Sequence, residues 1–463
     1  MASQQSKLIF LCLLAIVSVS FILNFPSIKY FFFQDDWFVL NNLTKEDLFA
    51  FLTLKENVIY WRPLGMQGFF LLSKNLFGLN PLNFHLLAFL FHAFNIILIS
   101  KIIYKIFKNR KAALVASFVY ATASFHYMSL SWLALTWNII GTSFLFLSLL
   151  LYLKKTKKSR ILSFICFLSA LASSEFALLL PFLLVIVDIL MGNNLIKVIK
   201  NNLLFYFPIT IILLTYFIFR FVIFKPQISA SYKPEFNYLV LKNSAWYLAW
   251  LFNIPDEVKY QINLSKFKFT QILLGGVGNF AYLAIFTPVI TFFSLVGLLL
   301  IKKIPLKKFL LLVFAFLLLL TPVLFFPNHS YSYYLTTSSI PFLLIISYAV
   351  ASSYKSRAGE LILVLFICSW FISSLTSLSF TRQVHWVDME QNLSKKAVFG
   401  IKENFPSIPS GSVLAIASET IMLKQSLLDQ EAAQVIFNDR TIKTEFVNLN
   451  EELEPYIYRY RFK

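Results

Sequence analysis

The segment "LLLYLKKTKKSRILSFICFLSALASSEFALLLPFLLVIV" (149–187) contains the features that decide the fold of the chain. A basic connector, "KKTKKSR" (154–160), lies between two apolar runs. A helix needs about 20 apolar residues to cross a bilayer, and short connectors rich in Lys and Arg lie on the cytoplasmic side. Glu175 interrupts the second run. We therefore interpret 161–174 and 176–191 as two short spans that meet at the outer side.

The composition of the whole chain agrees with a membrane protein. Of its 463 residues, 58% are hydrophobic and 14% are charged, whereas a soluble protein carries about a quarter charged residues. The formal net charge of +19 could indicate nucleic-acid binding. However, residues 381–463 hold 10 basic and 11 acidic residues, so the excess lies elsewhere, in short gaps between apolar runs. This distribution is typical of membrane topology, and we expect no nucleic-acid partner.

Eleven apolar segments are predicted to cross the membrane, and every second connector between them is basic. The segments are 8–23, 82–104, 112–128, 135–153, 161–174, 176–191, 203–223, 272–300, 309–326, 338–354 and 359–380. We interpret the first as a retained helix rather than a signal peptide, because no small-residue cleavage site follows it. The positive-inside rule then puts the N-terminus in the cytoplasm and the long loops 26–81 and 224–271 outside.

The last part of the chain differs in character from the rest. Residues 411–418 read as a buried strand, 419–437 as one amphipathic helix and 441–449 as a second strand. We therefore expect an all-α polytopic membrane protein of about 11 transmembrane helices, with a transmembrane domain at 1–380 and a small α/β extracytoplasmic domain at 381–463. No catalytic constellation is visible in this C-terminal domain.

Two adjacent acids in the first outer loop are the main candidates for chemistry. Asp35 and Asp36 lie in "KYFFFQDDWFVLNN" (29–42), between aromatic residues. Two carboxylates this close to each other and to apolar rings cannot both ionise easily, so the pKa of one is raised. Such a carboxylate can act as a general base toward a hydroxyl group. The simpler alternative is a loop whose acids face water.

Other candidates fall in the predicted outer loops or at the outer ends of spans. Arg62 precedes Pro63, which keeps the backbone before it extended, and a guanidinium offers a planar fork to phosphate oxygens. Glu175 is an acid at membrane depth, where acids usually face a cavity or a partner. Arg220 and His329 could reach an anionic headgroup at the same level. Snorkelling of the arginines and helix capping at Glu175 are the alternatives.

The order of these motifs resembles that of the GT-C membrane glycosyltransferases, and most closely their protein O-mannosyltransferase-like branch. The resemblance rests on "DDW" (35–37), "YWRPL" (60–64), "GLNPLNFH" (78–85) and the later Ser-Ser-Glu. It covers roughly residues 7–190 well, and the later spans by topology alone. It implies that Asp35 or Asp36 is the catalytic base or a metal-associated acid. It also aligns Glu175 and Arg62 with functional residues of the family.

Four more residues could line a site of this kind: Trp37, His85, His126 and Tyr333. For His85, which lies seven residues before His92 on one helix face, packing is the alternative explanation. The sequence departs from the family in having "YSYYL" (331–335) in the late outer loop, where an arginine is expected. Arg220 or His329 would then have to contact the lipid phosphate.

The sequence thus predicts an inverting glycosyltransferase in a cell membrane, most simply a bacterial cytoplasmic membrane. It would move a sugar from a polyprenyl-phosphate donor to a protein, lipid or glycan acceptor at the extracytoplasmic face. No cofactor is implied with certainty, and a divalent metal is compatible with the resemblance. The alternatives are a transporter or flippase for lipid-linked sugars, and a non-catalytic membrane scaffold.

Overall fold

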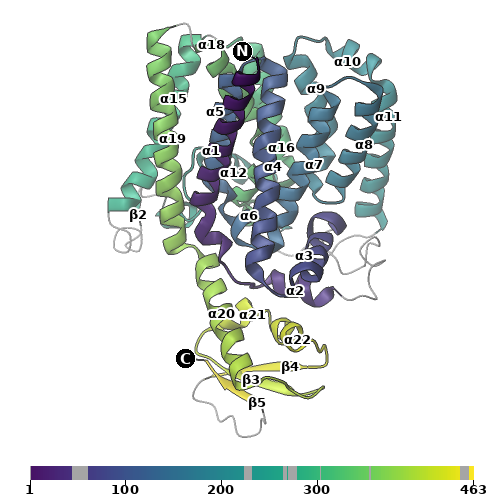
Figure 1. Ribbon diagram of the computed structural model, residues 1–463, viewed down its shortest axis with the longest axis vertical. Helices are drawn as coiled ribbons and strands as arrows, with labels where there is room; N and C mark the ends of the chain where they lie inside the picture. The colour runs from purple at the N-terminus through teal and green to yellow at the C-terminus, as the bar shows by residue number, and fades with distance from the viewer. Residues whose placement is uncertain are drawn as a thin grey trace.

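The computed structural model describes residues 2–43, 61–223, 232–263, 268–269, 279–302, 304–353, 356–448 and 458–462. The described chain is a bundle of helices with a small three-stranded sheet near its C-terminus (Figure 1). Within the described residues, six helices are long and apolar enough to cross a membrane, or up to nine if each of three bent helix pairs counts as one span. The predicted fold class, an all-α polytopic membrane protein with a small C-terminal domain, is confirmed.

Helices cover most of each described part of the eleven predicted spans. By length and composition, however, only six helices of the described residues could cross a membrane, or up to nine with each bent pair taken as one span, so the predicted number of about 11 is not confirmed. The helices of the bundle are α1 (Ala2–Ile28), α4 (Pro81–Phe107), α5 (Arg110–Thr122), α6 (Tyr127–Ser131), α7 (Thr136–Tyr152), α8 (Lys157–Leu171), α9 (Leu180–Leu190), α10 (Leu195–Asn201), α11 (Leu203–Phe217), α12 (Leu239–Leu251), α13 (Val258–Gln261), α15 (Asn279–Lys302), α16 (Leu306–Leu324), α17 (Leu335–Ser338), α18 (Ile340–Ser353) and α19 (Arg357–Val384). Two short helices, α2 (Asp35–Asn42) and α3 (Phe69–Phe77), precede α4, and β1 (Ile262–Asn263) pairs with β2 (Lys268–Phe269).

The division of 161–191 into two short helices is also found. Helix α8 ends at Leu171, a 3-10 helix runs from Glu175 to Leu179, and α9 begins at Leu180. The Ser174 side chain accepts a hydrogen bond from the backbone N–H of Phe176 and so caps the new helical segment. Helices α8 and α9 have 15 and 11 residues, which is shorter than the roughly 20 of a full span.

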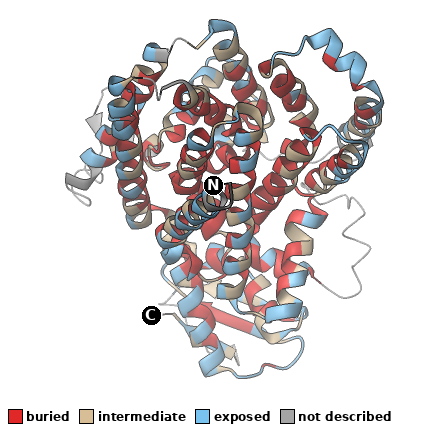
Figure 2. Ribbon diagram, turned by 45° about the horizontal axis from the view of Figure 1, so that its top comes forward, coloured by how far each residue is buried: buried red, intermediate tan, exposed pale blue. Residues whose placement is uncertain are grey.

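The two ends of the bundle differ. The N-terminus and α10 lie at one end, and α2, α3 and the C-terminal sheet lie at the other (Figure 1). Figure 2 shows buried residues mostly inside the bundle and exposed ones on its outer surface. On α11, for example, Leu204, Phe207 and Leu214 are exposed, as expected for side chains that face lipid. Which end faces the cytoplasm stays a prediction from the basic connectors.

The C-terminal domain is a parallel α/β unit. It consists of α20 (Trp386–Asn404), β3 (Val413–Ala417), α21 (Ile421–Leu427), α22 (Glu431–Phe437), β4 (Lys443–Val447) and β5 (Tyr458–Arg461). The sheet order is β4-β3-β5, with Ala415 opposite Glu445 on one side and Arg459 on the other. The two predicted strands are confirmed, whereas the single predicted helix 419–437 is wrong. Leu428 and Asp429 have φ angles of 50° and 52°, in the left-handed region, and this breaks the helix into α21 and α22.

A close approach of backbones fixes the turn between α8 and α9. A Cβ atom added at Gly141 on α7 would lie 2.5 Å from Ser174 Cβ, and one at Gly65 would lie 2.8 Å from Ser173 Cβ. Glycine is therefore required at both positions. The contact holds the serine turn against α7 and against the π-helix Pro63–Gly68. Because Glu175 follows this turn, the same contact determines where its carboxylate lies.

We expect Gly141→Ala to destabilise the protein, because the new methyl group must push the serine turn away from α7. Overpacking of this kind costs about 1–3 kcal/mol, so the thermal unfolding temperature of the purified protein in detergent should fall. Gly297→Ala on α15 is the matched control, since its Cβ would meet Ile362 at an ordinary 3.6 Å. An unchanged unfolding temperature in Gly141→Ala would contradict the close packing.

Candidate functional site

A cavity of about 310 Å³ opens at the end of the bundle that carries α2. Its walls come from the start of α2, the segment before α3, the α6–α7 connection, the tyrosine-rich segment after α16, and the start of α20. The cavity brings together four residues that the sequence analysis singled out, namely Asp35, Arg62, His329 and Tyr333. Asp36, Trp37, Glu175, His85 and His126 are not part of its wall.

The two adjacent acids have different surroundings. The Asp36 carboxylate is fully buried and accepts hydrogen bonds from the backbone N–H groups of Phe33, at 3.2 Å, and Ala134, at 2.6 Å. It thereby joins α2 to the 3-10 helix Leu133–Leu135 that precedes α7. Burial raises the pKa of Asp36, and the two amides oppose the increase. Asp36 thus holds α2 in place.

Asp35 is the acid that faces the cavity. Asp35 is exposed, in contrast to Asp36, and it lines the cavity. Removal of water by the cavity walls raises the pKa of Asp35. The next residue, Trp37, is buried and donates a hydrogen bond from Nε1 to Ser394 Oγ at 3.0 Å. Trp37 therefore anchors α2 against α20 rather than lining the cavity.

A third acid, Glu390 on α20, lies beside Asp35 and was not predicted. Gln34 Nε2 donates a hydrogen bond to Glu390 Oε2, and both residues line the cavity. Burial raises the pKa of Glu390 to about 7, and the charge of Asp35 contributes to the increase. Nothing local in the sequence indicates this contact, since Gln34 and Glu390 are separated by 356 positions.

The backbone at Gln34 is strained. Its φ of 47° and ψ of −125° are unfavourable for a residue with a side chain. The Gln34 N–H donates to the Ser426 carbonyl of the C-terminal domain at 2.9 Å, which helps to hold this conformation. Strain of this kind persists only where the surroundings impose it, and here it lies at the residue directly before α2.

Arg62 is fixed in the cavity wall by Glu175. Arg62 Nε lies 3.1 Å and Nη2 2.9 Å from Glu175 Oε2, and the guanidinium lies 3.4 Å from the centre of the Trp137 ring. Arg62 is 7% exposed, and Glu175 itself does not reach the cavity. The two residues that the sequence analysis treated separately therefore form one ion pair, in which Glu175 positions the cation.

His329 belongs to a cluster of aromatic residues. Its Nε2 lies 2.8 Å from the Tyr232 hydroxyl, and Tyr331 and Tyr333 stack at 5.5 Å between ring centres. Burial, together with the positive charges of Arg62 and Lys259, lowers the pKa of His329 to about 4. At neutral pH the imidazole is therefore uncharged, so it can form hydrogen bonds with an anion without adding a positive charge.

Two tryptophans of the cavity wall have buried donors without acceptors. In the part of the chain that the structure describes, Trp132 Nε1 and Trp137 Nε1 have no hydrogen-bond partner. A buried donor without a partner costs free energy and is rare in folded proteins. A ligand with oxygen acceptors, or water, is the natural partner for these two N–H groups.

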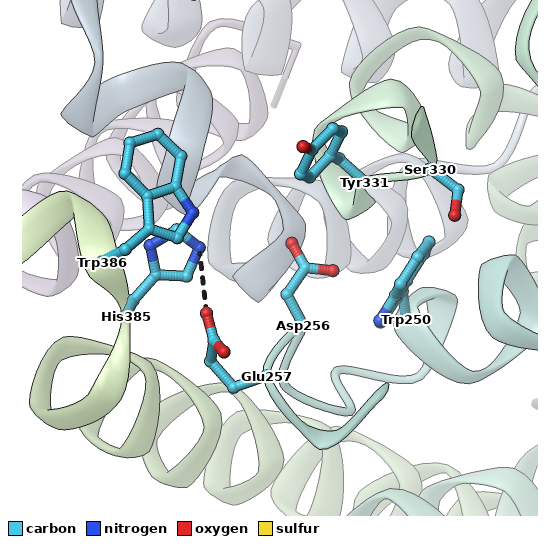
Figure 3. Close-up of a pocket in the computed structure, with 7 residues that line it drawn as sticks. All are labelled: Trp250, Asp256, Glu257, Ser330, Tyr331, His385 and Trp386. Atoms are coloured by element: carbon cyan, nitrogen blue, oxygen red, sulfur yellow. Dashed lines mark ion pairs between the residues drawn. The ribbon is translucent and has the colours of Figure 1, made fainter. Parts of the chain in front are cut away.

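A second cavity of about 170 Å³ adjoins the first and shares Tyr331 and Trp386 with it (Figure 3). Its other residues are Trp250, Asp256, Glu257, Ser330 and His385. Asp256 accepts hydrogen bonds from the N–H of Ser332 and, at 2.6 Å, from its hydroxyl. Burial raises the pKa of Asp256 to about 6 and that of Glu257 to about 7. "NIPDEV" (253–258) could have been noticed as a second pair of adjacent acids.

The remaining candidates lie elsewhere. His85 Nδ1 lies 2.9 Å from the Leu130 carbonyl oxygen, and His126 lies between Thr336 Oγ1, at 3.2 Å, and the Tyr120 carbonyl oxygen, at 3.0 Å. Both histidines are buried between helices. The side chain of Arg220 is outside the described residues. Among the described residues, no group of three or more His, Cys, Asp or Glu could hold a metal ion.

No protein-family model and no curated protein matches the chain. Solved structures that are similar to it include the following two. ArnT from Cupriavidus metallidurans, bound to undecaprenyl phosphate, is 10% identical with a TM-score of 0.48, over 96% of this chain and 89% of that one. The archaeal oligosaccharyltransferase AglB from Archaeoglobus fulgidus, in complex with an inhibitory peptide and a dolichol-phosphate, is 12% identical with a TM-score of 0.45. In that case 94% of this chain is covered and 64% of AglB. At these similarities, function must be inferred from this chain's own residues.

We expect Asp36→Asn to destabilise the protein, because the amide can accept only one of the two backbone hydrogen bonds and turns its own N–H groups toward the other donor. The loss should be about 1–3 kcal/mol in the free energy of unfolding, measured as a lower unfolding temperature in detergent. Asp35→Asn is the matched control and should change stability by less than about 0.5 kcal/mol. Equal destabilisation by both substitutions would contradict the different roles of the two acids.

Proposed function

We propose that the protein is an integral-membrane glycosyltransferase of the GT-C type. It would transfer a sugar from a polyprenyl-phosphate donor to an acceptor hydroxyl at the extracytoplasmic face, with inversion at the anomeric carbon. The observation that carries the proposal is the first cavity. It combines a carboxylate of raised pKa, Asp35, with a fixed cation, Arg62, and with neutral hydrogen-bond donors. The membrane around the lipid-exposed helices would supply the donor, which diffuses within it.

The proposed reaction is a single displacement. Asp35 takes the proton of the acceptor hydroxyl as its oxygen forms a bond to the anomeric carbon. The bond between that carbon and the phosphate oxygen breaks, and its electron pair stays on the phosphate. Arg62 and the indole N–H of Trp137 stabilise the negative charge that grows there. Attack from the face opposite to the leaving phosphate inverts the anomeric centre.

The location of the charged residues favours this function over transport. Asp35, Arg62, His329 and Glu390 all lie outside the helices that could span the membrane. A transporter typically binds its substrate near the middle of the bilayer, between interrupted helices. The lipid part of the donor that we propose is of the kind bound in the structures of ArnT, with undecaprenyl phosphate, and AglB, with a dolichol-phosphate. The sequence resemblance to the O-mannosyltransferase-like branch makes a hexose such as mannose the first sugar to test.

We expect Asp35→Asn to reduce sugar transfer at least about a hundredfold, because loss of a general base removes this factor or more. Cells that lack their own copy of the protein express each variant at the same level. Mass spectrometry then measures their extracytoplasmic glycans and lipid-linked sugars. The lipid-linked sugar should accumulate as the glycan disappears. Asp429→Asn, at an exposed position of the C-terminal domain, is the control. Normal transfer in Asp35→Asn would exclude the proposed base and favour a scaffold.

Glu390 should make donor binding dependent on pH. As the pH rises through the Glu390 pKa of about 7, a second negative charge enters the cavity beside Asp35. The half-saturating concentration of the anionic donor should then increase roughly three- to tenfold. In Glu390→Gln this increase should be absent, whereas Glu403→Gln, exposed on the same helix, should behave as the wild type. A pH profile that Glu390→Gln leaves unchanged would argue against this role.

A further inference from the structure

The second cavity has no role in the reaction described so far, although it opens beside the first. Its residues come from the end of α12 and the segment after it, the segment before Ser332, and the junction of α19 with α20. Tyr331 and Trp386, which lie on different sides of the second cavity (Figure 3), also line the first. A molecule bound in the second cavity could therefore extend past these two rings toward Asp35.

The polar groups of this cavity include a donor and an acceptor that do not satisfy each other. His385 Nδ1 accepts a hydrogen bond from the Val387 N–H at 3.2 Å. The proton of the neutral imidazole therefore sits on Nε2, which faces Glu257 Oε1 (Figure 3). These atoms are 3.6 Å apart, too far for a hydrogen bond. A hydroxyl group beside both atoms, rather than on the line between them, can donate to Glu257 and accept from His385.

A further donor and two aromatic rings complete the cavity. Trp250 Nε1 is buried without a hydrogen-bond partner among the described residues. Trp250 and Trp386 offer apolar ring surfaces beside the polar groups. A sugar ring has the matching chemistry, since it presents C–H groups on its faces and hydroxyl groups at its edge. The volume of about 170 Å³, several times the ~30 Å³ of one water, suits a single ring.

Other ligand classes fit less well. An anion would meet the carboxylates of Asp256 and Glu257. A simple cation offers no acceptor to His385 Nε2–H or Trp250 Nε1–H, and would leave both donors unpaired. A hydroxyl-rich neutral ligand satisfies all of these groups together.

We propose that the second cavity is a subsite for a neutral sugar ring of a glycan acceptor, bound by Glu257, His385 and Trp250. This inference rests on the proposed glycosyltransferase function and narrows the acceptor to a glycan. The bound ring holds the acceptor so that a hydroxyl of the adjoining part of the molecule reaches Asp35.

The test uses the full-length protein in lipid nanodiscs. The donor is the lipid-linked sugar fraction, and the acceptor is the extracytoplasmic glycan fraction, both isolated from cells that lack the protein. Glu257→Gln should raise the half-saturating amount of glycan about tenfold or more, because it replaces a carboxyl group by an amide that presents N–H groups to the ligand hydroxyl. The half-saturating amount of donor should stay within about twofold. Trp250→Phe, which keeps a ring but removes the N–H, should act in the same direction.

One substitution outside the cavity serves as the control: Glu235→Gln. Glu235 does not line the second cavity, and this variant should match the wild type. Unchanged glycan saturation in Glu257→Gln and Trp250→Phe would overturn the subsite. The subsite would also be overturned if these variants changed the half-saturating amounts of donor and of glycan equally. Loss of transfer after protease treatment of the acceptor fraction would overturn it too, because it would identify a peptide acceptor.

A separate measurement distinguishes failure of the subsite from failure of the proposed function. Quenching of tryptophan fluorescence by the same glycan fraction reports binding without turnover. Binding that is present in the wild type and in Asp35→Asn, and lost in Glu257→Gln, supports the subsite. If the wild type then transfers no sugar, the transferase proposal alone fails. Absence of quenching in the wild type overturns the subsite.

Discussion

The arrangement of the site depends on two backbone amides that converge on the buried carboxylate of Asp36. This contact joins the loop after α1 to the turn before α7, two segments about a hundred residues apart. An amide buried without an acceptor is costly, so the loop keeps its conformation only while Asp36 serves both donors. The direction of α2 follows from this contact. With α2 fixed, Asp35 lies at the cavity and Trp37 meets Ser394.

The C-terminal domain contributes to the same site. Residues of α2 and α4, such as Leu40 and Phe84, share one apolar core with Ile401 of α20 and Leu423 of α21. Polar contacts cross the same boundary, among them the bond from the Phe31 N–H to Gln391 Oε1. The start of α20 supplies Trp386 and Glu390 to the cavity. A domain that looked like an appendage in the sequence therefore closes the site, and loosening it would also remove a wall of the cavity.

The helices could be predicted because the information for them is local. A span needs a run of apolar residues and basic flanks, and even the break at Glu175 is visible in 161–191. The contacts of the site are not local. The pairing of Arg62 with Glu175, the buried place of Asp36, and the approach of Glu390 to Gln34 depend on packing between distant segments. Several residues of the cavity could therefore be predicted from the sequence, whereas the division of the two adjacent acids into an anchor and a cavity-facing group could not.

The charges of the cavity bear on how the proposed reaction is accelerated. Glu175 already neutralises part of the Arg62 charge, His329 is uncharged at neutral pH, and Asp35 adds a negative charge. Such a site attracts a donor with one negative charge only weakly. When the sugar leaves, the lipid phosphate gains a second negative charge, and interactions with the fixed guanidinium and the indole N–H strengthen. Only interactions that are stronger in the transition state than in the ground state raise the rate of the chemical step. A cation that is paired with a carboxylate binds the ground-state donor less strongly than a free cation would, and it therefore meets this requirement. The lipid tail can supply the binding of the donor in the ground state.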